Sequence, residues 1–403
     1  MKVLETKKPY GLLLFLILYS ANGISYFNRV VYPIATLFLL AVSFYWIFKN
    51  RVHLKGLRKF FIGWVAYCFI SFIYFETFHP LFFVLFPIVI LSAYVLIKSD
   101  RELKTTFDIY EKIIFIFAKI SLFFFAWQLV SISSLVSLFS LVDLNIGKSY
   151  NAIIYTIHNK AVSDQINQNS GFCWEPGPFA CFLSLALIIH LLKNKFVLDK
   201  RVLIYVITLL TTFSSTGYFC LLIIFAWYIY RLNSKYFIFF LPVVILFIMT
   251  VFNFSSNLNE KVLPQIINAQ ENFEFYSEYG REYQTSIGRF DGFLLNLEDF
   301  YNFPIIGYGG HLSATFSQVN KLNISSTSGL GNWLSQFGII GILFLSVSLY
   351  KSSQLLVNSY QSKGGVVVLS IFLVIIFSFN LLFSPIFVFF FFIGLFKSKQ
   401  SFI

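Results

Sequence analysis

Long apolar runs, separated by short polar segments, follow one another along the whole chain. Because a bilayer core of ~30 Å needs roughly 20 residues of apolar helix, these runs predict membrane-spanning helices. Eight of them have the length of one span each: 10–27, 30–48, 60–76, 80–97, 113–135, 172–192, 236–253 and 327–350. The pattern therefore predicts an all-α polytopic integral membrane protein, in which residues 1–403 form a single membrane domain.

Two further apolar blocks, 202–230 and 364–396, are long for one span and short for two. As one helix, the first would measure about 43 Å at ~1.5 Å per residue. Its middle, Thr211-Thr212-Phe213-Ser214-Ser215-Thr216-Gly217, carries polar groups that lipid would not satisfy. If each block forms two short helices that meet at a polar turn, the basic residues that flank the block lie on the same side of the membrane. This interpretation gives about twelve spans. One tilted helix per block is the alternative.

The basic residues are unevenly divided between the two sides that twelve spans create. With the N-terminus inside, twenty-two of the 30 Lys and Arg residues fall in inner segments and seven in outer ones. Lys and Arg accumulate in cytoplasmic loops, so both termini are predicted to be cytoplasmic. The medium loop 140–171 and the large loop 254–326 are then both outside, with no inner counterpart. This asymmetry favours chemistry at the outer surface.

Composition supports the membrane assignment and explains the net charge. The chain is 58% hydrophobic and 12% charged, whereas soluble domains are about 25% charged, so a water-soluble globule is excluded. The net charge of +12 follows mainly from the inner loops, and we expect no nucleic-acid partner. The four cysteines, which show no disulfide or metal-ligand spacing, are expected to be buried thiols.

A carboxylate stands where the medium outer loop enters a span, in the stretch from Gln168 to Ala180. Glu175 precedes Pro176, and a proline is typical of the first turn of a helix. One interpretation makes Glu175 a capping carboxylate that suits the helix dipole. The other makes it a base at the mouth of a cavity, positioned by Trp174, because an ionisable group at membrane depth indicates function.

Residues 288–301 predict a helix that lies in the outer interface. An apolar stripe recurs at helical spacing on one face: Phe290, Phe293, Leu294, Leu297 and Tyr301. Arg289 begins this helix, where a cation opposes the dipole unless an anion binds there. Pairing of Arg289 with Glu282 or Asp291 is the alternative. Glu298 and Asp299 diverge by ~100° on a helix, so a solvated face is expected there and not a metal site.

Two more candidates lie on either side of this helix. Arg281 stands beside Glu278 and Glu282, either ion-paired or free to meet an anion. The run Gly307-Tyr308-Gly309-Gly310-His311 follows no strand, so it is not a dinucleotide fingerprint. We interpret it as a loop that allows close backbone approach to a ligand. His311 is a base, a donor or simply a loop histidine.

Four ordered features resemble the O-antigen polymerase and ligase superfamily, and its polymerase (Wzy-type) branch best. They cover about the second half of the chain: Gly171 to Gly177, the turn Ser214 to Tyr218, the segment from Arg289 to Gly309, and Asn332 to Gly341. Each is degenerate, and the order and spacing carry the resemblance. It implies a membrane glycosyltransferase of the C-type class in the bacterial inner membrane, with its active site facing the periplasm.

Such enzymes transfer a growing chain from undecaprenyl pyrophosphate to the hydroxyl of an incoming lipid-linked repeat. The resemblance implies no metal or other cofactor, and it allows a chain-length regulator protein as a partner beside the membrane lipid. Arg289 and Arg281 would stabilise the leaving pyrophosphate. Glu175 or His311 would activate the acceptor hydroxyl. Further substrate contacts are expected from four residues: Trp174, Tyr308, Asn332 and Lys160.

Two departures from the family pattern bear on the alternatives. Ligases of this superfamily carry a His about eleven residues before the first Gly of a G-x-x-G, and here that position is Thr327. Many polymerases carry an Arg before the glutamate motif where this chain has Gln168, which leaves Lys160 as a substitute. An O-antigen ligase and a polysaccharide-unit flippase or transporter stay as the competing functions.

Overall fold

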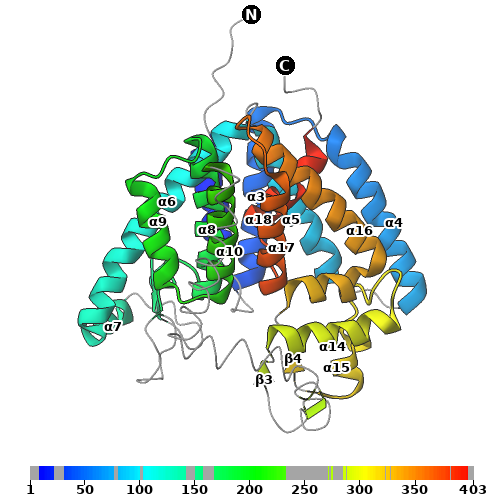
Figure 1. Ribbon diagram of the computed structural model, residues 1–403. Coiled ribbons are helices and arrows are strands. Elements are labelled where there is room, and N and C mark those ends of the chain that lie inside the picture. The colour runs from blue at the N-terminus through cyan, green and yellow to red at the C-terminus, as the bar shows by residue number, and fades with distance from the viewer. Residues whose placement is uncertain are drawn as a thin grey trace, which may run out of the picture.

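Apolar helices that run up and down along one common direction dominate the computed structural model (Figure 1). The structure describes these residues: 9–21, 31–76, 80–99, 103–141, 150–157, 168–232, 271, 274–275, 285–286, 288–322, 324–326, 328–381 and 383–397. The expected span 236–253 lies outside them, as do most of the large loop before Gly288 and the two candidates Lys160 and Arg281.

The helices of the bundle are α1 (Tyr10–Ala21), α3 (Val31–Asn50), α4 (Lys55–Phe75), α5 (Pro80–Ser99), α6 (Leu103–Val130), α8 (Pro176–Lys193), α9 (Lys200–Thr211), α10 (Ser215–Leu232), α16 (Gly329–Asn358), α17 (Gly365–Ser378) and α18 (Pro385–Phe396). Among the described residues, 6 helices are long and apolar enough to cross a membrane: α3, α4, α5, α6, α8 and α16. An all-α fold is confirmed and a multi-pass membrane protein is plausible, whereas twelve spans stay a prediction.

Each of the two long apolar blocks contains two helices, as the polar turns predicted. The first block divides into α9 and α10 around Thr212–Ser214, and Tyr218 Oη donates back to the Leu210 carbonyl over 3.0 Å. The second divides into α17 and α18, whose Phe372 and Phe391 rings pack 5.3 Å apart. The alternative of one tilted helix per block is therefore wrong.

Most described basic side chains gather at one end of the bundle, which we call the basic end. Three contacts define it. Lys98 Nζ donates to the Phe396 carbonyl over 2.9 Å, Lys193 Nζ lies 3.4 Å from Asp108, and Arg231 donates to the Lys363 carbonyl over 2.8 Å. These contacts join the ends or starts of α5, α6, α8, α10, α17 and α18. The opposite end, beside α14 (Arg289–Asn302), is the α14 end.

A buried polar cluster, here the α6–α8–α9 clamp, fastens three helices at the basic end. Glu111 of α6 is fully buried and lies 3.1 Å from Nδ1 of His190 on α8. His190 Nε2 lies 3.0 Å from Asp199, which also caps α9 by accepting the backbone N–H groups of Arg201 and Val202. This cluster was not predicted, because Glu111 lies far from His190 and Asp199 in the chain.

At the α14 end lie shorter elements, among which α14 runs across the direction of the bundle (Figure 1). They are α7 (Ile132–Ser140), the antiparallel pair β1 (Tyr150–Asn151) and β2 (Thr156–Ile157), the parallel pair β3 (Thr285–Ser286) and β4 (Ile324–Ser325), α14 (Arg289–Asn302), η1 (Leu312–Ala314) and α15 (Phe316–Val319). The helix expected at 288–301 is α14.

The face of α14 that was expected to be solvated is buried. Asp291, Leu295 and Asp299, spaced four residues apart, are 2–4% exposed, whereas Tyr301 of the apolar stripe is 69% exposed. Asp299 Oδ1 accepts the backbone N–H of Phe316 over 2.5 Å, so the start of α15 covers this face. The solvated-face prediction for Asp299 is therefore wrong, since a later segment supplies it with a donor.

The glycine run after α14 fits into a break in α16. Gly338 has φ 62° and ψ −157°, and this left-handed φ interrupts the helix. The loop supplies the backbone partners that the break leaves free: Tyr308 N–H donates to the Ser335 carbonyl over 2.9 Å, and Ile339 N–H donates to the Pro304 carbonyl over 2.8 Å. The close approach expected at these glycines is thus made to α16.

Candidate functional site

Arg289 is the first residue of α14 and reaches across the α14 end to another helix. Its Nη1 donates to Ser215 Oγ over 3.0 Å and to Thr216 Oγ1 over 3.3 Å, both in the first turn of α10. Its guanidinium carbon lies 4.6 Å from the centre of the Phe379 ring. Two hydroxyls and a ring face hold the cation in place without neutralising it.

Of the two alternative partners of Arg289, Asp291 lies among the described residues and can be compared with the prediction. Asp291, two residues further on, forms no ion pair with Arg289 in the part of the chain that the structure describes. Glu282 lies outside the described residues. Burial lowers the pKa of the Arg289 guanidinium, and the neighbouring Glu175 opposes this by raising it. A half-buried cation with no ion pair among the described acids is suited to an external anion.

The first turns of four helices meet around Arg289 and Phe379. Arg289 itself starts α14, and its hydroxyl partners start α10. A Cβ added at Gly177, in the first turn of α8, would collide with the Phe379 ring. One added at Gly329, which starts α16, would collide with the Phe379 carbonyl. Because helix starts carry free N–H groups and a partial positive charge, their convergence with a guanidinium favours an anion.

Glu175 stands at the edge of this arrangement. It occupies the N-cap position of α8, with φ −144° and ψ 157°, and Pro176 follows at the first helical position. Its side chain makes no capping hydrogen bond, so Glu175 stands where a capping residue was expected and can act on α8 through its charge alone. Glu175 is half-buried and forms no ion pair with Arg289 among the described residues. Among the described residues, the Glu175 carboxylate is therefore not committed to a hydrogen bond within its own helix start.

His311 and Tyr308 lie in a different part of the α14 end. The His311 ring is 3% exposed and stacks on Phe75 of α4 at 4.5 Å, with Phe83 of α5 at 6.0 Å. Tyr308 is 6% exposed and is fixed to α16 through its backbone. The structure therefore brings Glu175 and Arg289 together, and groups His311 and Tyr308 with α4, α5 and the break in α16.

The other substrate-contact candidates have packing roles that can be stated. Trp174 is half-buried and packs against the main apolar core. Asn332, in the first turn of α16, donates to the Ser326 carbonyl over 3.4 Å. Lys160, Arg281 and the ligase-register position Thr327 lie outside the described residues. Among the described candidates, Glu175 and Arg289 are the charged pair that lies at this meeting of helix starts, and Asn332 lies in one of the same first turns.

Three contributors to this site were not singled out as contacts in the sequence. Ser215 and Thr216 were noted as a helix break, and only the fold shows that their hydroxyls face Arg289. Phe379 follows Ser378 and precedes Asn380, and these polar neighbours inside an apolar block were the available signal. Among the described residues, no three His, Cys, Asp or Glu side chains gather as a potential metal site, so we assign no metal ligands.

Comparison with known proteins adds no relative: no family model matches the chain, and neither a curated protein nor a solved structure is similar to it. The functional conclusion therefore depends on the residues of the site themselves.

Proposed function

We propose that the protein polymerises oligosaccharide repeats linked to undecaprenyl pyrophosphate into an O-antigen or a related surface polysaccharide. The observation that supports this most is Arg289, held by Ser215 and Thr216 where the first turns of four helices converge. A pyrophosphate is an anion that such a site accommodates. The four sequence features that resemble O-antigen polymerases include both Arg289 and Glu175.

In the proposed reaction, the acceptor hydroxyl of the incoming repeat attacks the anomeric carbon of the growing chain. A new carbon–oxygen glycosidic bond forms, and the bond from that carbon to the pyrophosphate oxygen breaks. Glu175 takes the proton of the acceptor hydroxyl. The undecaprenyl pyrophosphate leaves with the bonding electron pair, and Arg289 with the helix starts stabilises the charge that develops on it.

The proposed setting is the bacterial inner membrane, with the α14 end facing the periplasm. The gathering of described basic residues at the opposite end supports this orientation, since Lys and Arg favour the cytoplasmic side. Lipid-linked repeats would then reach Arg289 from the outer leaflet. A protein that regulates chain length is a further proposed partner.

Deletion of the gene tests the reaction class. We expect deletion cells to accumulate single-repeat product, and complementation with the wild-type gene to restore a polymer ladder of surface polysaccharide on gels. Free lipid-linked long chains together with an uncapped lipid A core in the deletion would identify a ligase instead. Retention of lipid-linked repeats on the cytoplasmic leaflet would identify a flippase.

A further inference from the structure

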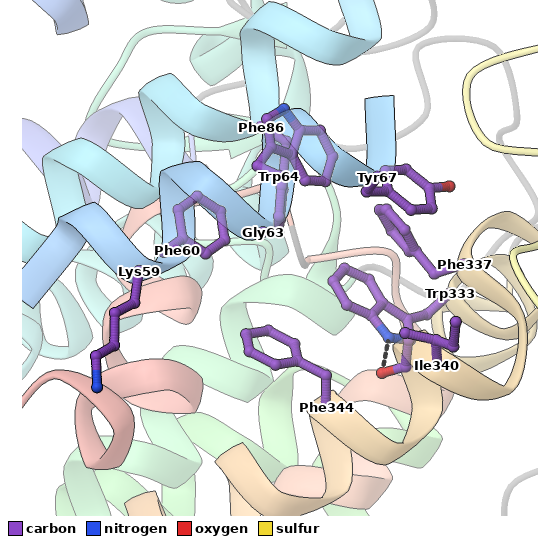
Figure 2. Close-up of a pocket in the computed structure, with 11 residues that line it drawn as sticks. Lys59, Phe60, Gly63, Trp64, Tyr67, Phe86, Trp333, Phe337, Ile340 and Phe344 are labelled. Atoms are coloured by element: carbon purple, nitrogen blue, oxygen red, sulfur yellow. Dashed lines mark hydrogen bonds between the residues drawn. The ribbon is translucent and has the colours of Figure 1, made fainter. Parts of the chain in front are cut away.

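A cavity of about 270 Å³ opens between α4 and α16 (Figure 2). We call it the α4–α16 groove. Aromatic side chains make up most of its lining: Phe60, Trp64 and Tyr67 from α4, Phe86 from α5, and Trp333 and Phe337 from α16. Trp64 and Phe86 pack 4.9 Å apart and Trp333 and Phe337 pack 4.2 Å apart, so the aromatic walls support one another.

The walls of the groove are apolar in spite of their Trp and Tyr residues. Trp64 Nε1 donates to the Phe83 carbonyl over 3.0 Å, and Trp333 Nε1 donates to the Gly341 carbonyl over 2.9 Å, which Figure 2 shows as a dashed line. Tyr67 Oη donates to the Ile306 carbonyl over 3.1 Å. Because each of these polar atoms has a partner within the protein, an occupant of the groove meets ring carbons and is itself apolar.

The helix faces on both sides of the groove are exposed and apolar. Val65 and Phe69 on α4 and Leu343 on α16 are each more than 60% exposed. In a chain with six helices long and apolar enough to span a membrane, such faces contact lipid. A helix, with a diameter of about 10 Å, does not enter a cavity of this size, whereas a single alkyl chain does.

One end of the groove is cationic. Among the described residues that line it, Lys59 alone is charged, and Lys55 and Arg58 lie on the same exposed turns at the start of α4. The chain has no acidic residue from Arg51 to Phe75. A cluster of exposed cations next to a membrane helix attracts anionic lipid headgroups. The long Lys59 side chain can reach the headgroup region while its stem lies along the groove.

The position of Lys59 selects the leaflet. Along α4 the groove extends from Lys59 to Tyr67, about 12 Å at ~1.5 Å per residue. Half of a ~30 Å hydrocarbon core is about 15 Å, so the groove, measured from Lys59 near the basic end, has about the depth of one leaflet. The contacts of Arg289 are made to Ser215, Thr216 and Phe379, none of which lines the groove, so the groove is distinct from the pyrophosphate site proposed above and its assignment does not depend on that proposal.

We propose that the α4–α16 groove binds one acyl chain of an anionic phospholipid whose phosphate lies at Lys59. The aromatic walls hold the chain, the cations of the first turns of α4 select the headgroup, and the lipid belongs to the leaflet of the basic end. The groove is thus a specific lipid site on the lipid-facing surface of α4 and α16.

Glycine substitutions provide a filled groove and a matched control. Gly63 lines the groove, and a Cβ added there meets no heavy atom within 4 Å, so a leucine side chain at this position has room to start into the groove. Gly11 on α1 is equally open, and Gly11→Leu adds the same side chain away from the groove. Lys59→Gln removes the charge of the headgroup site and leaves the walls intact.

Native mass spectrometry of the full-length protein in detergent micelles measures the binding. The micelles are titrated with dioleoylphosphatidylglycerol or with dioleoylphosphatidylcholine, which have the same chains and different charge. For the wild type and Gly11→Leu we expect one phosphatidylglycerol to bind about fivefold more tightly than phosphatidylcholine. Lys59→Gln should abolish this preference. Gly63→Leu should weaken both lipids about tenfold, since its side chain displaces about two methylene groups.

Three results would overturn the proposal. Equal binding of the two lipids to the wild type would exclude Lys59 as a site for an anionic headgroup. Unchanged lipid binding to Gly63→Leu would exclude the groove as the site of the acyl chain. Farnesyl phosphate could also compete with phosphatidylglycerol for the wild type. If Gly63→Leu weakens this competition and Lys59→Gln does not, the groove would be assigned to an isoprenoid chain. Thermal melting of each variant in detergent establishes that it is folded. If Gly63→Leu is unfolded, the loss of the phosphatidylglycerol preference in Lys59→Gln is the test of the proposal.

Discussion

Arg289 donates a hydrogen bond of 3.0 Å to Ser215, a residue 74 positions earlier in the chain. The bond links the first turn of α14 to the first turn of α10, so a helix that lies across the bundle is fixed to one that runs along it. Two motifs that were separate in the sequence thereby become one site. The proposed pyrophosphate-binding role of Arg289 depends on this arrangement.

Glu175→Gln distinguishes a role of Glu175 as a base from a role in stability, because the two roles predict different changes in the polymerisation rate and in the free energy of unfolding. Because the side chain makes no capping hydrogen bond, Glu175→Gln should change the free energy of unfolding by less than about 0.5 kcal/mol. Loss of a general base should lower the polymerisation rate about a hundredfold or more. Thermal melting and polymer synthesis in membranes measure the two effects. Glu298→Gln, which removes a carboxylate from α14, is the control, and equal rates for the two variants would exclude Glu175 as the base.

The break in α16 should require glycine at position 338. Alanine there would adopt an unfavourable left-handed φ, and its Cβ would come within 2.5 Å of the Ile305 carbonyl oxygen. We expect Gly338→Ala to destabilise the protein by about 1–3 kcal/mol, as measured by thermal melting in detergent. Gly11→Ala, at a glycine with open space around it, should leave stability within about 1 kcal/mol. Equal melting temperatures for the two variants would contradict this account of the break.

Asp299 should make stability fall as the pH rises. Burial raises the pKa of Asp299 from 3.8 to about 6, opposed by the Phe316 N–H. Between these values the folded protein holds a proton that the unfolded chain has lost, so the free energy of unfolding decreases with pH up to about 6 and then levels off. The loss approaches about 3 kcal/mol at 1.36 kcal/mol per pKa unit.

Asp299→Asn tests this pH dependence, because the amide oxygen can accept the same Phe316 N–H without ionising. The variant should melt at a higher temperature than the wild type at pH 7.5 and at a similar temperature near pH 4. A variant that is less stable than the wild type at pH 7.5 would show that the carboxylate is needed in its charged form.

The α6–α8–α9 clamp should be a major contributor to stability. His190→Leu removes the 3.1 Å imidazole partner of the buried Glu111, which keeps Arg201 at 3.3 Å, and the loss of one partner of a buried charged group costs about 1–3 kcal/mol. Lys119→Gln changes an exposed charge on the same helix and should cost less than about 0.5 kcal/mol. Thermal melting in detergent compares the two variants. A similar small effect of both would mean that the clamp is not stabilising.

The sequence identified features that depend on neighbours along the chain. The polar stretch from Thr211 to Gly217 predicted the division of its block into α9 and α10, and helical spacing predicted α14. The division of the second block into α17 and α18 was expected from its length and from the basic residues that flank it, Lys363 and Lys397. Features of this kind can be predicted because they depend on local sequence: polar groups that lipid cannot hydrogen-bond mark a turn, and apolar residues at helical spacing mark a helix.

Features that depend on distant partners could not be predicted in this way. Asp299 looked solvated because its donor, the Phe316 N–H, is supplied by a later segment. Gly307 and Gly309 suggested a loop that approaches a ligand. In the structure their loop bonds to the backbone on both sides of the break at Gly338, and nothing in the sequence around Gly338 indicates that this loop is its partner. Within the site, Glu175 and Arg289 were identified by charge, whereas Phe379, which holds the guanidinium, was hidden within an apolar block.

Arg289 provides the most direct test of the proposed function. Cells that lack the gene are complemented with wild type, Arg289→Ala or Lys321→Ala, the last of which removes an exposed cation at the same end of the bundle. Surface polysaccharide is resolved on gels, and membrane levels of each protein are measured by immunoblot. We predict that Lys321→Ala gives a normal ladder and that Arg289→Ala, at equal membrane level, lowers polymer at least about a hundredfold and leaves single repeats. A normal ladder from Arg289→Ala would contradict the pyrophosphate-binding role and the proposed function with it.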